Sequence, residues 1–178
     1  MRTIPSLAVS LALATALGDA TAWADAGARR MLVVQRAFPL EIILPNMLLM
    51  GATRAGNMIS ATLDEVTVND TRPGNRSWRA AVSATNFVTG DGAGPKTVSN
   101  ASVSYWSGPT TETSGSGTRA PGQATFNQRV PLSAQQTAFR ASKGPQPTST
   151  SWRPTLVITI PATAPVGTYT GTVVHSVA

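Results

Sequence analysis

The stretch that most restricts the fold of this chain is its last one, from Ser151 to Ala178. Two runs within it, Trp152–Pro161 and Gly167–Ala178, are rich in valine, isoleucine and threonine. These β-branched residues favour extended backbone, and a short turn that contains proline, at 162–166, separates the two runs. Such a pattern is typical of a β-hairpin. We therefore predict that the chain ends in two antiparallel strands, the second of which closes a sheet.

The composition favours a fold made of many short strands. Of the 178 residues, 42% are hydrophobic and only 12% are charged, whereas helical bundles need many glutamates and lysines on their faces. The 15 glycines and 13 prolines supply frequent turns. The run Trp78–Thr85 alternates mostly apolar and polar residues with the period of a strand. We predict one all-β domain, an Ig-like antiparallel β-sandwich of roughly seven to nine strands.

Two internal segments are predicted to lie outside the regular strands. Residues 108–122 are rich in glycine, serine, threonine and proline, a composition typical of a long loop. Residues 133–140 show weak helical character, with Ser133 in the position of a helix cap. We therefore expect the strands of the sandwich in other parts of the chain.

The first residues have the pattern of a secretory signal peptide. A short positive start, Met1–Arg2, precedes a mostly apolar run at 4–17, and small residues suited to cleavage follow at 20–26. The apolar run is short for a membrane span, which needs about 20 residues. An uncleaved N-terminal helix or a start at Met31 is the alternative. The predicted division is a signal peptide over 1–24, a flexible segment over 25–38 and the β-sandwich over 39–178, with no membrane span after removal of the leader.

The chain is basic, with 14 lysines and arginines against 8 aspartates and glutamates and a formal net charge of +6. Positive charge favours polyanionic partners through long-range attraction. Nucleic acid is not expected, because the basic residues are scattered singly and no basic cluster or helix follows Arg29–Arg30. For an exported bacterial protein, the expected partner is therefore a cell-wall glycan or an anionic wall polymer.

Few residues could carry catalysis or hold a metal. The one histidine, His175, stands in the last predicted strand, and no hydrolase, P-loop or dinucleotide-binding motif is present. Asp64, Glu65 and Asp70 form the main acidic group, but their spacing matches no calcium-binding loop. The chain has no cysteine, which excludes disulfides and thiolate metal sites. We expect no catalytic residue, no metal and no cofactor, and a protein that is not an enzyme.

The scarce aromatic residues are the candidates for short-range contacts. Tyr105 and Trp106 are adjacent, so in a regular strand they point to opposite faces, and we expect one ring to be exposed. An exposed ring can stack on a sugar or pack on a protein partner. The alternative for each aromatic residue, Trp78 included, is that it covers the core.

The order of these features resembles the WxL domain family of Gram-positive surface proteins, most closely its diverged versions in secreted actinobacterial proteins. Trp78-Arg79-Ala80, preceded by Asp70-Thr71-Arg72, matches the first Trp-x-Leu motif with alanine in place of leucine. His175-Ser176-Val177 occupies the place of the second motif, with histidine for tryptophan and valine for leucine. The Gly167-Thr168-Tyr169 frame before it is kept, and the resemblance covers roughly residues 40–178.

The resemblance implies a secreted, mostly β protein that associates non-covalently with the cell wall, with peptidoglycan as the ligand. In this reading, arginines attract anionic polymer over long range and aromatic rings stack on glycan. The residues expected to bind the ligand are Arg72, Trp78, Arg79 and His175, with Tyr105 and Trp106 in a secondary role. The alternative is a structural or adhesive subunit of a surface assembly, which binds other surface proteins through strand edges or an aromatic patch.

Overall fold

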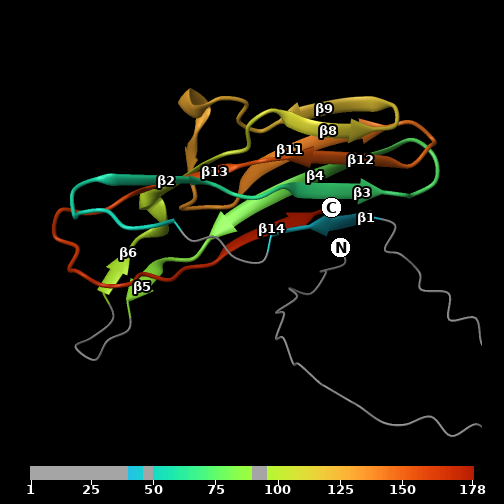
Figure 1. Ribbon diagram of the computed structural model, residues 1–178. Helices are drawn as coiled ribbons and strands as arrows, with labels where there is room; N and C mark the ends of the chain where they lie inside the picture. Colours follow the sequence, from blue (N-terminus) through green and yellow to red (C-terminus); the bar gives the residue numbers. More distant parts are fainter. Residues whose placement is uncertain (1–39, 46–49, 90–95) are drawn as a thin grey trace, which may run out of the picture. The chain divides into compact units, whose positions relative to one another are not determined.

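The computed structural model describes residues 40–45, 50–89 and 96–178, and all of them belong to one compact unit. The predicted signal peptide over 1–24 and the flexible segment over 25–38 lie outside the described residues. Within the described part, the chain forms fourteen strands and two short 3-10 turns, and every strand pairing is antiparallel (Figure 1). The same residues contain no helix with the length and apolar character of a membrane span.

The strands in chain order are β1 (Leu40–Ile43), β2 (Met58–Thr62), β3 (Val66–Asp70), β4 (Arg76–Ala84), β5 (Phe87–Thr89), β6 (Lys96–Val98), β7 (Val103–Trp106), β8 (Thr110–Ser114), β9 (Gly117–Pro121), β10 (Val130–Pro131), β11 (Gln136–Lys143), β12 (Thr148–Trp152), β13 (Thr155–Thr159) and β14 (Val173–Val177). The 3-10 turns are η1 (Asn100–Ser102) and η2 (Phe126–Gln128).

One layer of the fold is a bent sheet made of three long strands, each of which is interrupted once. Strands β2, β13 and β7 pair in that order, and β3, β12 and β8 pair in the same order beyond the interruption. Two of the interruptions contain a proline, Pro109 and Pro154, which cannot donate a ladder hydrogen bond. The sheet continues across the bend, because the Leu63 N–H donates to the Pro154 carbonyl at 2.7 Å.

The facing layer is the sheet β14-β4-β11-β9. The consecutive strands β3 and β4, β8 and β9, and β11 and β12 lie in different layers, so the chain crosses from one layer to the other at each of these connections (Figure 1). Gly117 begins β9 with φ at +130°, and a Cβ there would overlap the Ser142 carbonyl of the neighbouring strand β11. The all-β antiparallel sandwich predicted from the sequence is thus confirmed, with more segments than expected because the long strands are interrupted.

Three local predictions are wrong. The two C-terminal runs do not form a hairpin, because β13 pairs with β2 and β7 in the bent layer whereas β14 pairs with β4 in the facing layer. Residues 133–140 do not form a helix, since most of them belong to the central strand β11. Residues 108–122 form β8 and β9 rather than one long loop.

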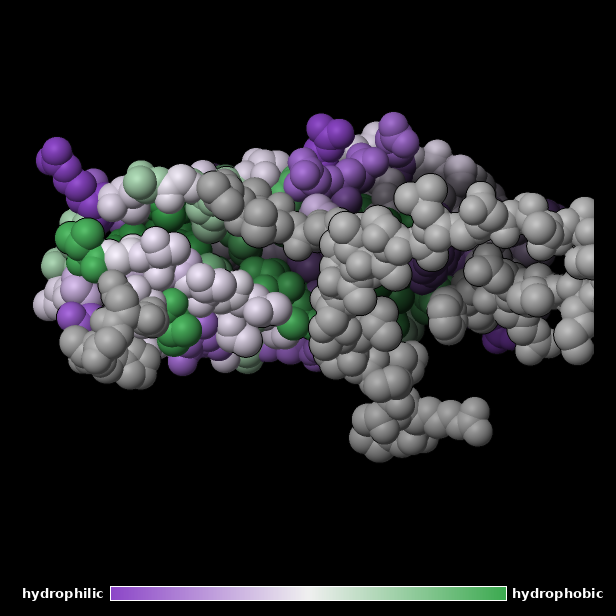
Figure 2. All heavy atoms as spheres, turned by 60° about the horizontal axis from the view of Figure 1, so that its bottom comes forward, coloured by the Kyte–Doolittle hydropathy of each residue, from purple (hydrophilic) through white to green (hydrophobic). Residues whose placement is uncertain are grey.

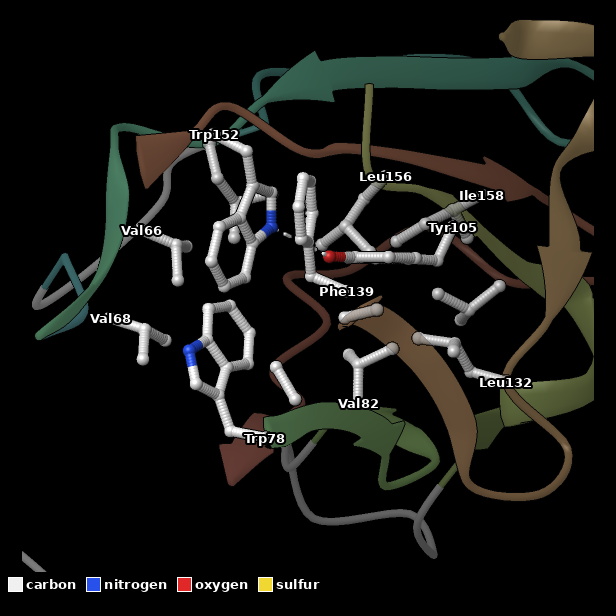
Figure 3. Packing of buried hydrophobic residues seen from close by; sticks show 14 of the residues in the cluster. Val66, Val68, Trp78, Val82, Tyr105, Leu132, Phe139, Trp152, Leu156 and Ile158 are labelled. Atoms are coloured by element: carbon white, nitrogen blue, oxygen red, sulfur yellow. Dashed lines mark hydrogen bonds between the residues drawn. The ribbon is translucent and has the colours of Figure 1, made fainter. Parts of the chain in front are cut away.

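The core lies between the two layers and centres on three aromatic rings (Figure 3). Trp152 stacks on Phe139 with ring centroids 4.8 Å apart, and Trp78 lies 6.4 Å from Trp152 and 6.3 Å from Phe139. These rings come from β12, β11 and β4, so they join the bent layer to the facing layer. Buried aliphatic side chains surround the rings, among them Val66, Val68, Val82, Val103, Leu132, Leu156 and Ile158.

Candidate functional site: a cationic end of the β14-β4-β11-β9 sheet

The structure divides the six predicted site residues into a buried group of three, a surface group of two and the half-buried Trp106. Trp78, Tyr105 and His175 are only 4%, 0% and 7% exposed, so their rings belong to the core and cannot stack on a ligand. Arg79 is exposed on the outer face of β4, and Arg72 lies at the turn that precedes this strand. The expectation of an aromatic contact surface built on Trp78 and Tyr105 is therefore wrong, because the sandwich uses these rings to fill its interior.

Trp106 is half-buried and does not provide the exposed ring that was expected. Its neighbour Tyr105 points into the core, so the two side chains do face opposite sides of β7, as adjacent strand residues must. The Trp106 Nε1 and the Gln123 Oε1 are buried atoms that have no hydrogen-bond partner among the described residues. Trp106 thus lies half-buried on the outer side of β7 and does not present an open ring face for stacking.

A buried hydrogen-bond chain joins Tyr105 and His175. Trp152 Nε1 donates to Tyr105 Oη at 3.4 Å, and Tyr105 Oη lies 3.3 Å from His175 Nε2. An indole N–H can only donate, so the tyrosine hydroxyl accepts from Trp152. With His175 the hydroxyl either donates to an unprotonated Nε2 or accepts from an Nε2–H, depending on the tautomer of the imidazole. Trp78 lies next to this hydrogen-bonded group, with its ring centroid 6.4 Å from that of Trp152, and His175 faces Val82 rather than Trp78 in the register of the sheet.

Burial also determines the ionisation of this pair. Removal from water lowers the pKa of His175 to about 4. Burial raises the pKa of Tyr105 as well, against a smaller opposing effect of the hydrogen bond from Trp152. Both side chains are therefore neutral at physiological pH, and the buried imidazole does not supply the accessible positive charge that binding of an anionic ligand would use.

Stability should fall on acidification because His175 cannot accept a proton in the fold. The folded-state pKa of about 4 lies below the ordinary 6.5, so the unfolded chain binds more protons between these values. The free energy of unfolding should then decrease as pH falls from about 6.5 to about 4, by roughly 3 kcal/mol in total. Urea unfolding at a series of pH values measures this loss.

His175→Phe is the matched variant for the acid test, since it keeps an aromatic ring at the same place and removes the titrating group. Its unfolding free energy should change with pH less steeply than that of the wild type over the same interval. An identical pH slope in the two proteins would show that His175 does not govern the acid sensitivity.

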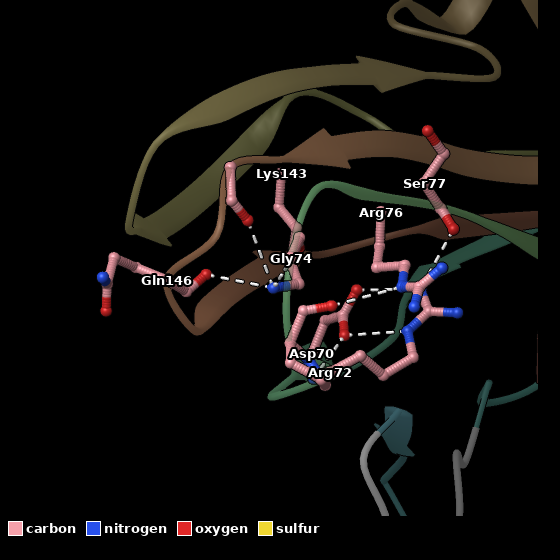
Figure 4. A network of polar contacts seen from close by, with 9 residues as sticks. Asp70, Arg72, Gly74, Arg76, Ser77, Lys143 and Gln146 are labelled. Carbon is pink, nitrogen blue, oxygen red and sulfur yellow. Dashed lines mark hydrogen bonds and ion pairs between the residues drawn. The ribbon is translucent and has the colours of Figure 1, made fainter.

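The surface group is organised around an ion pair at the β3–β4 turn, between the buried Asp70 and the half-buried Arg72 (Figure 4). The Asp70 carboxylate, fully buried at the end of β3, accepts from Arg72 Nε at 2.9 Å, from Arg72 Nη2 at 2.8 Å and from the Arg72 backbone N–H at 3.0 Å. Arg72 Nη2 also donates to the Ser77 carbonyl at 3.0 Å. The ion pair therefore fixes the turn to the first residues of β4.

Lys143 completes this arrangement from β11. Its side chain is buried, and Nζ donates to the carbonyls of Gly74, Gly144 and Gln146 at 3.2–3.3 Å. Burial by itself raises the pKa of Asp70, but the hydrogen bonds from Arg72 and the charges of Arg72 and Lys143 outweigh burial and hold that pKa below its ordinary value. The hydrogen bond to Asp70 raises the pKa of Arg72 in turn. The hydrogen bonds of Lys143 thus join the β3–β4 turn to the β11–β12 turn, next to the ion pair of Asp70 and Arg72.

Two arginines lie side by side on the outer face of the sheet next to these turns. Arg79 on β4 and Arg140 on β11 are direct register partners, and both are exposed. Residues paired in this way have Cβ atoms about 5 Å apart, and like charges there destabilise the sheet. Within the described residues, neither guanidinium makes a hydrogen bond or an ion pair. The further neighbours in register are Ala120 on β9 beside Arg140 and the backbone of Ala178 beside Arg79.

The arginine pair faces a shallow open groove of about 450 Å³, lined by Ser77, Trp78, Arg79, Arg140, Ala141 and Ala178. A second groove of about 500 Å³ continues past Ser77 towards Arg76, Ser142 and Lys143. A row of hydroxyl groups lies between the two grooves, because Ser142 pairs with Ser77 on one side and with Thr118 on the other. The Thr118 and Ser142 hydroxyls are 2.7 Å apart. The face therefore offers cations and hydroxyl groups with only small side chains between them.

Sequence reasoning found Arg72 and Arg79 but missed Arg140 and Lys143. Both missed residues lie on β11, and their proximity to β4 depends on a strand register that no local pattern reveals. The acidic residues do not assemble into a metal site: Glu65 accepts from Thr111 at 2.8 Å and lies 3.8 Å from Arg153, while Asp70 is occupied by Arg72. Over the described ranges, no group of three or more histidine, aspartate or glutamate side chains could hold a metal ion.

Comparisons with protein-family models, with curated proteins and with solved structures find no match to this chain.

Proposed function

We propose that this chain is an exported, non-enzymatic surface protein that associates non-covalently with the bacterial cell wall through the cationic end of the β14-β4-β11-β9 sheet. The ligand in this proposal is an anionic wall polymer or peptidoglycan. The observation that carries it is the paired, unpartnered Arg79 and Arg140 on an open face, next to the turns that hold Arg72 and Arg76. The resemblance of Trp78-Arg79-Ala80 to the WxL motif belongs to the same proposal.

The arrangement supports binding of an extended anion better than catalysis. Arg79 and Arg140 extend from rigid strands into solvent, where they can attract a polyanion over about a Debye length. His175, the one histidine of the chain, is buried against Tyr105, and the Asp70 carboxylate at the neighbouring turn is held by Arg72. General acid–base chemistry needs such groups at a site that the substrate can reach.

A second candidate is a subunit of a surface assembly that binds another protein through a strand edge. The specific observation is that β1 and β14 stand at the edges of their sheets and carry exposed Ile43 and Val174. The exposed hydrophobic residues are scattered, however, and Figure 2 shows separate green patches divided by pale and purple residues on the face in view, where grey atoms do not cover it. A continuous apolar patch would be the stronger sign of a protein partner.

Sedimentation with purified Gram-positive wall sacculi tests the proposed function. We expect saturable binding of the folded full chain that weakens steadily as ionic strength rises from about 0.01 M to about 1 M, because the Debye length falls from about 30 Å to about 3 Å over that range. A folded protein that stays in the supernatant at the lowest ionic strength would contradict wall binding. Recovery of a defined oligomer or of a stoichiometric protein complex would then favour the assembly subunit.

A further inference from the structure

We infer that one end of the sandwich is a peripheral docking surface for an anionic lipid membrane. This end holds the β13–β14 loop, the start of β2 and the strand β5 (Figure 1). Strand β4 runs towards it from the arginine groove, so the two sites lie at opposite ends of the sandwich and share no residue. The inference therefore goes beyond the proposed function and rests on different observations.

Three segments that are far apart in the chain meet at this end. Met58, the first residue of β2, pairs with Thr159 at the end of β13. Thr170, near the end of the β13–β14 loop, exchanges two backbone hydrogen bonds of 2.9 Å with Val88 on β5. The loop at 160–172 therefore reaches from β2 to β5, and the three segments form one surface.

Each of these segments exposes a large apolar side chain. Met58 and Val88 are exposed, and Val166 in the loop is fully exposed. The loop around Val166 is itself apolar, since residues 160–167 include a single polar side chain, whereas surface loops are usually polar. Apolar side chains that project into water gain free energy when they enter an apolar phase. The end therefore has the property that insertion into a membrane requires.

Hydrogen bonds hold the loop in one conformation. The Tyr169 hydroxyl donates to the Pro165 carbonyl at 2.9 Å, which closes the loop across Val166. The Ala164 N–H donates to the Pro161 carbonyl at 2.9 Å, which closes the turn before it. The two prolines restrict the backbone further. Val166 is thus presented by a loop that is already formed, so insertion loses little conformational entropy.

Two cations flank the apolar side chains. Arg54 is exposed in the turn before β2, where its carbonyl accepts from the Asn57 N–H at 3.1 Å, and Lys96 is exposed on β6 opposite Thr89. Within the described ranges, neither cation forms an ion pair. The carboxylates of those ranges lie on β1, beyond the far end of β2, at the end of β3 and on β8 (Glu41, Asp64, Glu65, Asp70 and Glu112). Positive charge beside apolar side chains matches the anionic headgroups of a membrane.

The separation of the apolar side chains favours a bilayer over a protein partner. A stable protein interface needs a continuous, closely packed area of about 800 Å² on each partner. Here single apolar side chains project from different segments, and Figure 2 shows green residues at this end that are separated by pale and purple ones. A fluid bilayer can rearrange around separate side chains, whereas a soluble polyanion would gain nothing from them. Anionic lipid is therefore the partner that uses both features.

Flotation with lipid vesicles tests the docking surface in the full chain. The wild type should bind vesicles of equimolar phosphatidylglycerol and phosphatidylcholine about tenfold more tightly than vesicles of phosphatidylcholine alone. Met58→Ser/Val166→Ser should weaken binding to the anionic vesicles by about tenfold or more. The matched control, Ile43→Ser/Phe126→Ser, replaces two exposed apolar side chains on β1 and η2 and should bind like the wild type.

A second pair of variants tests the charges. Arg54→Gln/Lys96→Gln should weaken binding to anionic vesicles by about tenfold. Arg79→Gln/Arg140→Gln removes the same net charge from the arginine groove and should weaken vesicle binding clearly less. The order should be reversed with sacculi, so the failure of membrane docking and the failure of wall binding are measured separately.

A fluorescent label reports insertion directly. The chain has no cysteine, so Val166→Cys and Ile43→Cys can each carry one environment-sensitive fluorophore. The emission of the label at position 166 should shift to shorter wavelength with anionic vesicles, and that of the label at position 43 should not.

Several results would overturn membrane docking. These are the absence of flotation, equal binding by the two serine variants and an equal response of the two labels. Equal binding by all variants would assign flotation to another part of the chain, such as the apolar run at 4–17, and would overturn docking as well. A soluble protein that shields the label at position 166, where vesicles leave it unchanged, would replace the bilayer with a protein partner.

Discussion

Trp78→Ala is expected to lower the free energy of unfolding by about 3–5 kcal/mol, the usual cost of removing a large buried aromatic side chain. The indole is only 4% exposed and packs against both Trp152 and Phe139, so its loss opens a cavity between the two layers of the sandwich. Chemical unfolding of the purified variant measures the change. From the sequence alone, Trp78 was expected to bind the ligand, so the same substitution would have been expected to weaken binding.

Trp78→Phe is the control for this prediction, because it keeps an aromatic ring and reduces the cavity. Its loss of stability should be clearly smaller than that of Trp78→Ala. A Trp78→Ala variant with wild-type stability would show that the ring is not part of the core.

Asp70→Ala is expected to lower the free energy of unfolding by about 2 kcal/mol, below the cost of breaking a fully buried pair, since Asp70 is buried but Arg72 is half-buried and reaches water. Arg72 and the buried Lys143 would lose the carboxylate that faces them, and the turn would lose the hydrogen bond from the Arg72 backbone. In the wild type this contribution is complete above the ordinary aspartate pKa of 3.8 and is lost as pH falls through the lower folded-state pKa. Unfolding titrations at neutral pH measure the difference directly.

Asp70→Asn separates charge from hydrogen bonding, because the amide can still accept from the Arg72 backbone N–H. We expect it to lose part of the stability that Asp70→Ala loses, and Glu41→Gln, which removes an exposed carboxylate from β1, should change stability little. If Asp70→Ala and Glu41→Gln were equally stable, the ion pair would not hold the two turns.

Period-2 alternation made the central part of the fold predictable. Trp78, Ala80 and Val82 all point inward on β4, as the alternating pattern indicates. The same rule failed on β11, where the register shifts between Thr137 and Phe139. That bulge places Ala138 and Phe139 both in the interior, which hides the strand period and imitates a helical pattern.

The pairing of the C-terminal runs could not be derived from local sequence. The turn between them suggested a hairpin, but each run is bound to strands far away in the chain, β13 to β2 and β7, and β14 to β4. Which strand joins which sheet depends on these distant contacts rather than on the turn.

The candidate site shows the same limit. Arg79 could be predicted as a site residue because it follows the tryptophan of a recognisable motif. Arg140 could not, because only its position opposite Arg79 in the sheet makes it part of the site. The aromatic residues were scarce enough to attract attention, but scarcity does not tell whether a ring lies inside or outside. In this sandwich Trp78, Tyr105 and His175 lie inside.

The central claim is that the exposed Arg79 and Arg140 bind the cell wall, whereas the buried Trp78 stabilises the core. The most direct measurement is sedimentation with sacculi of three folded proteins at one low ionic strength: the wild type, Arg79→Gln/Arg140→Gln and Trp78→Phe. We predict that the arginine variant keeps its stability and loses most of its binding, while Trp78→Phe loses stability and keeps its binding as long as it is folded. Binding that is retained by the arginine variant but lost by folded Trp78→Phe would contradict the account.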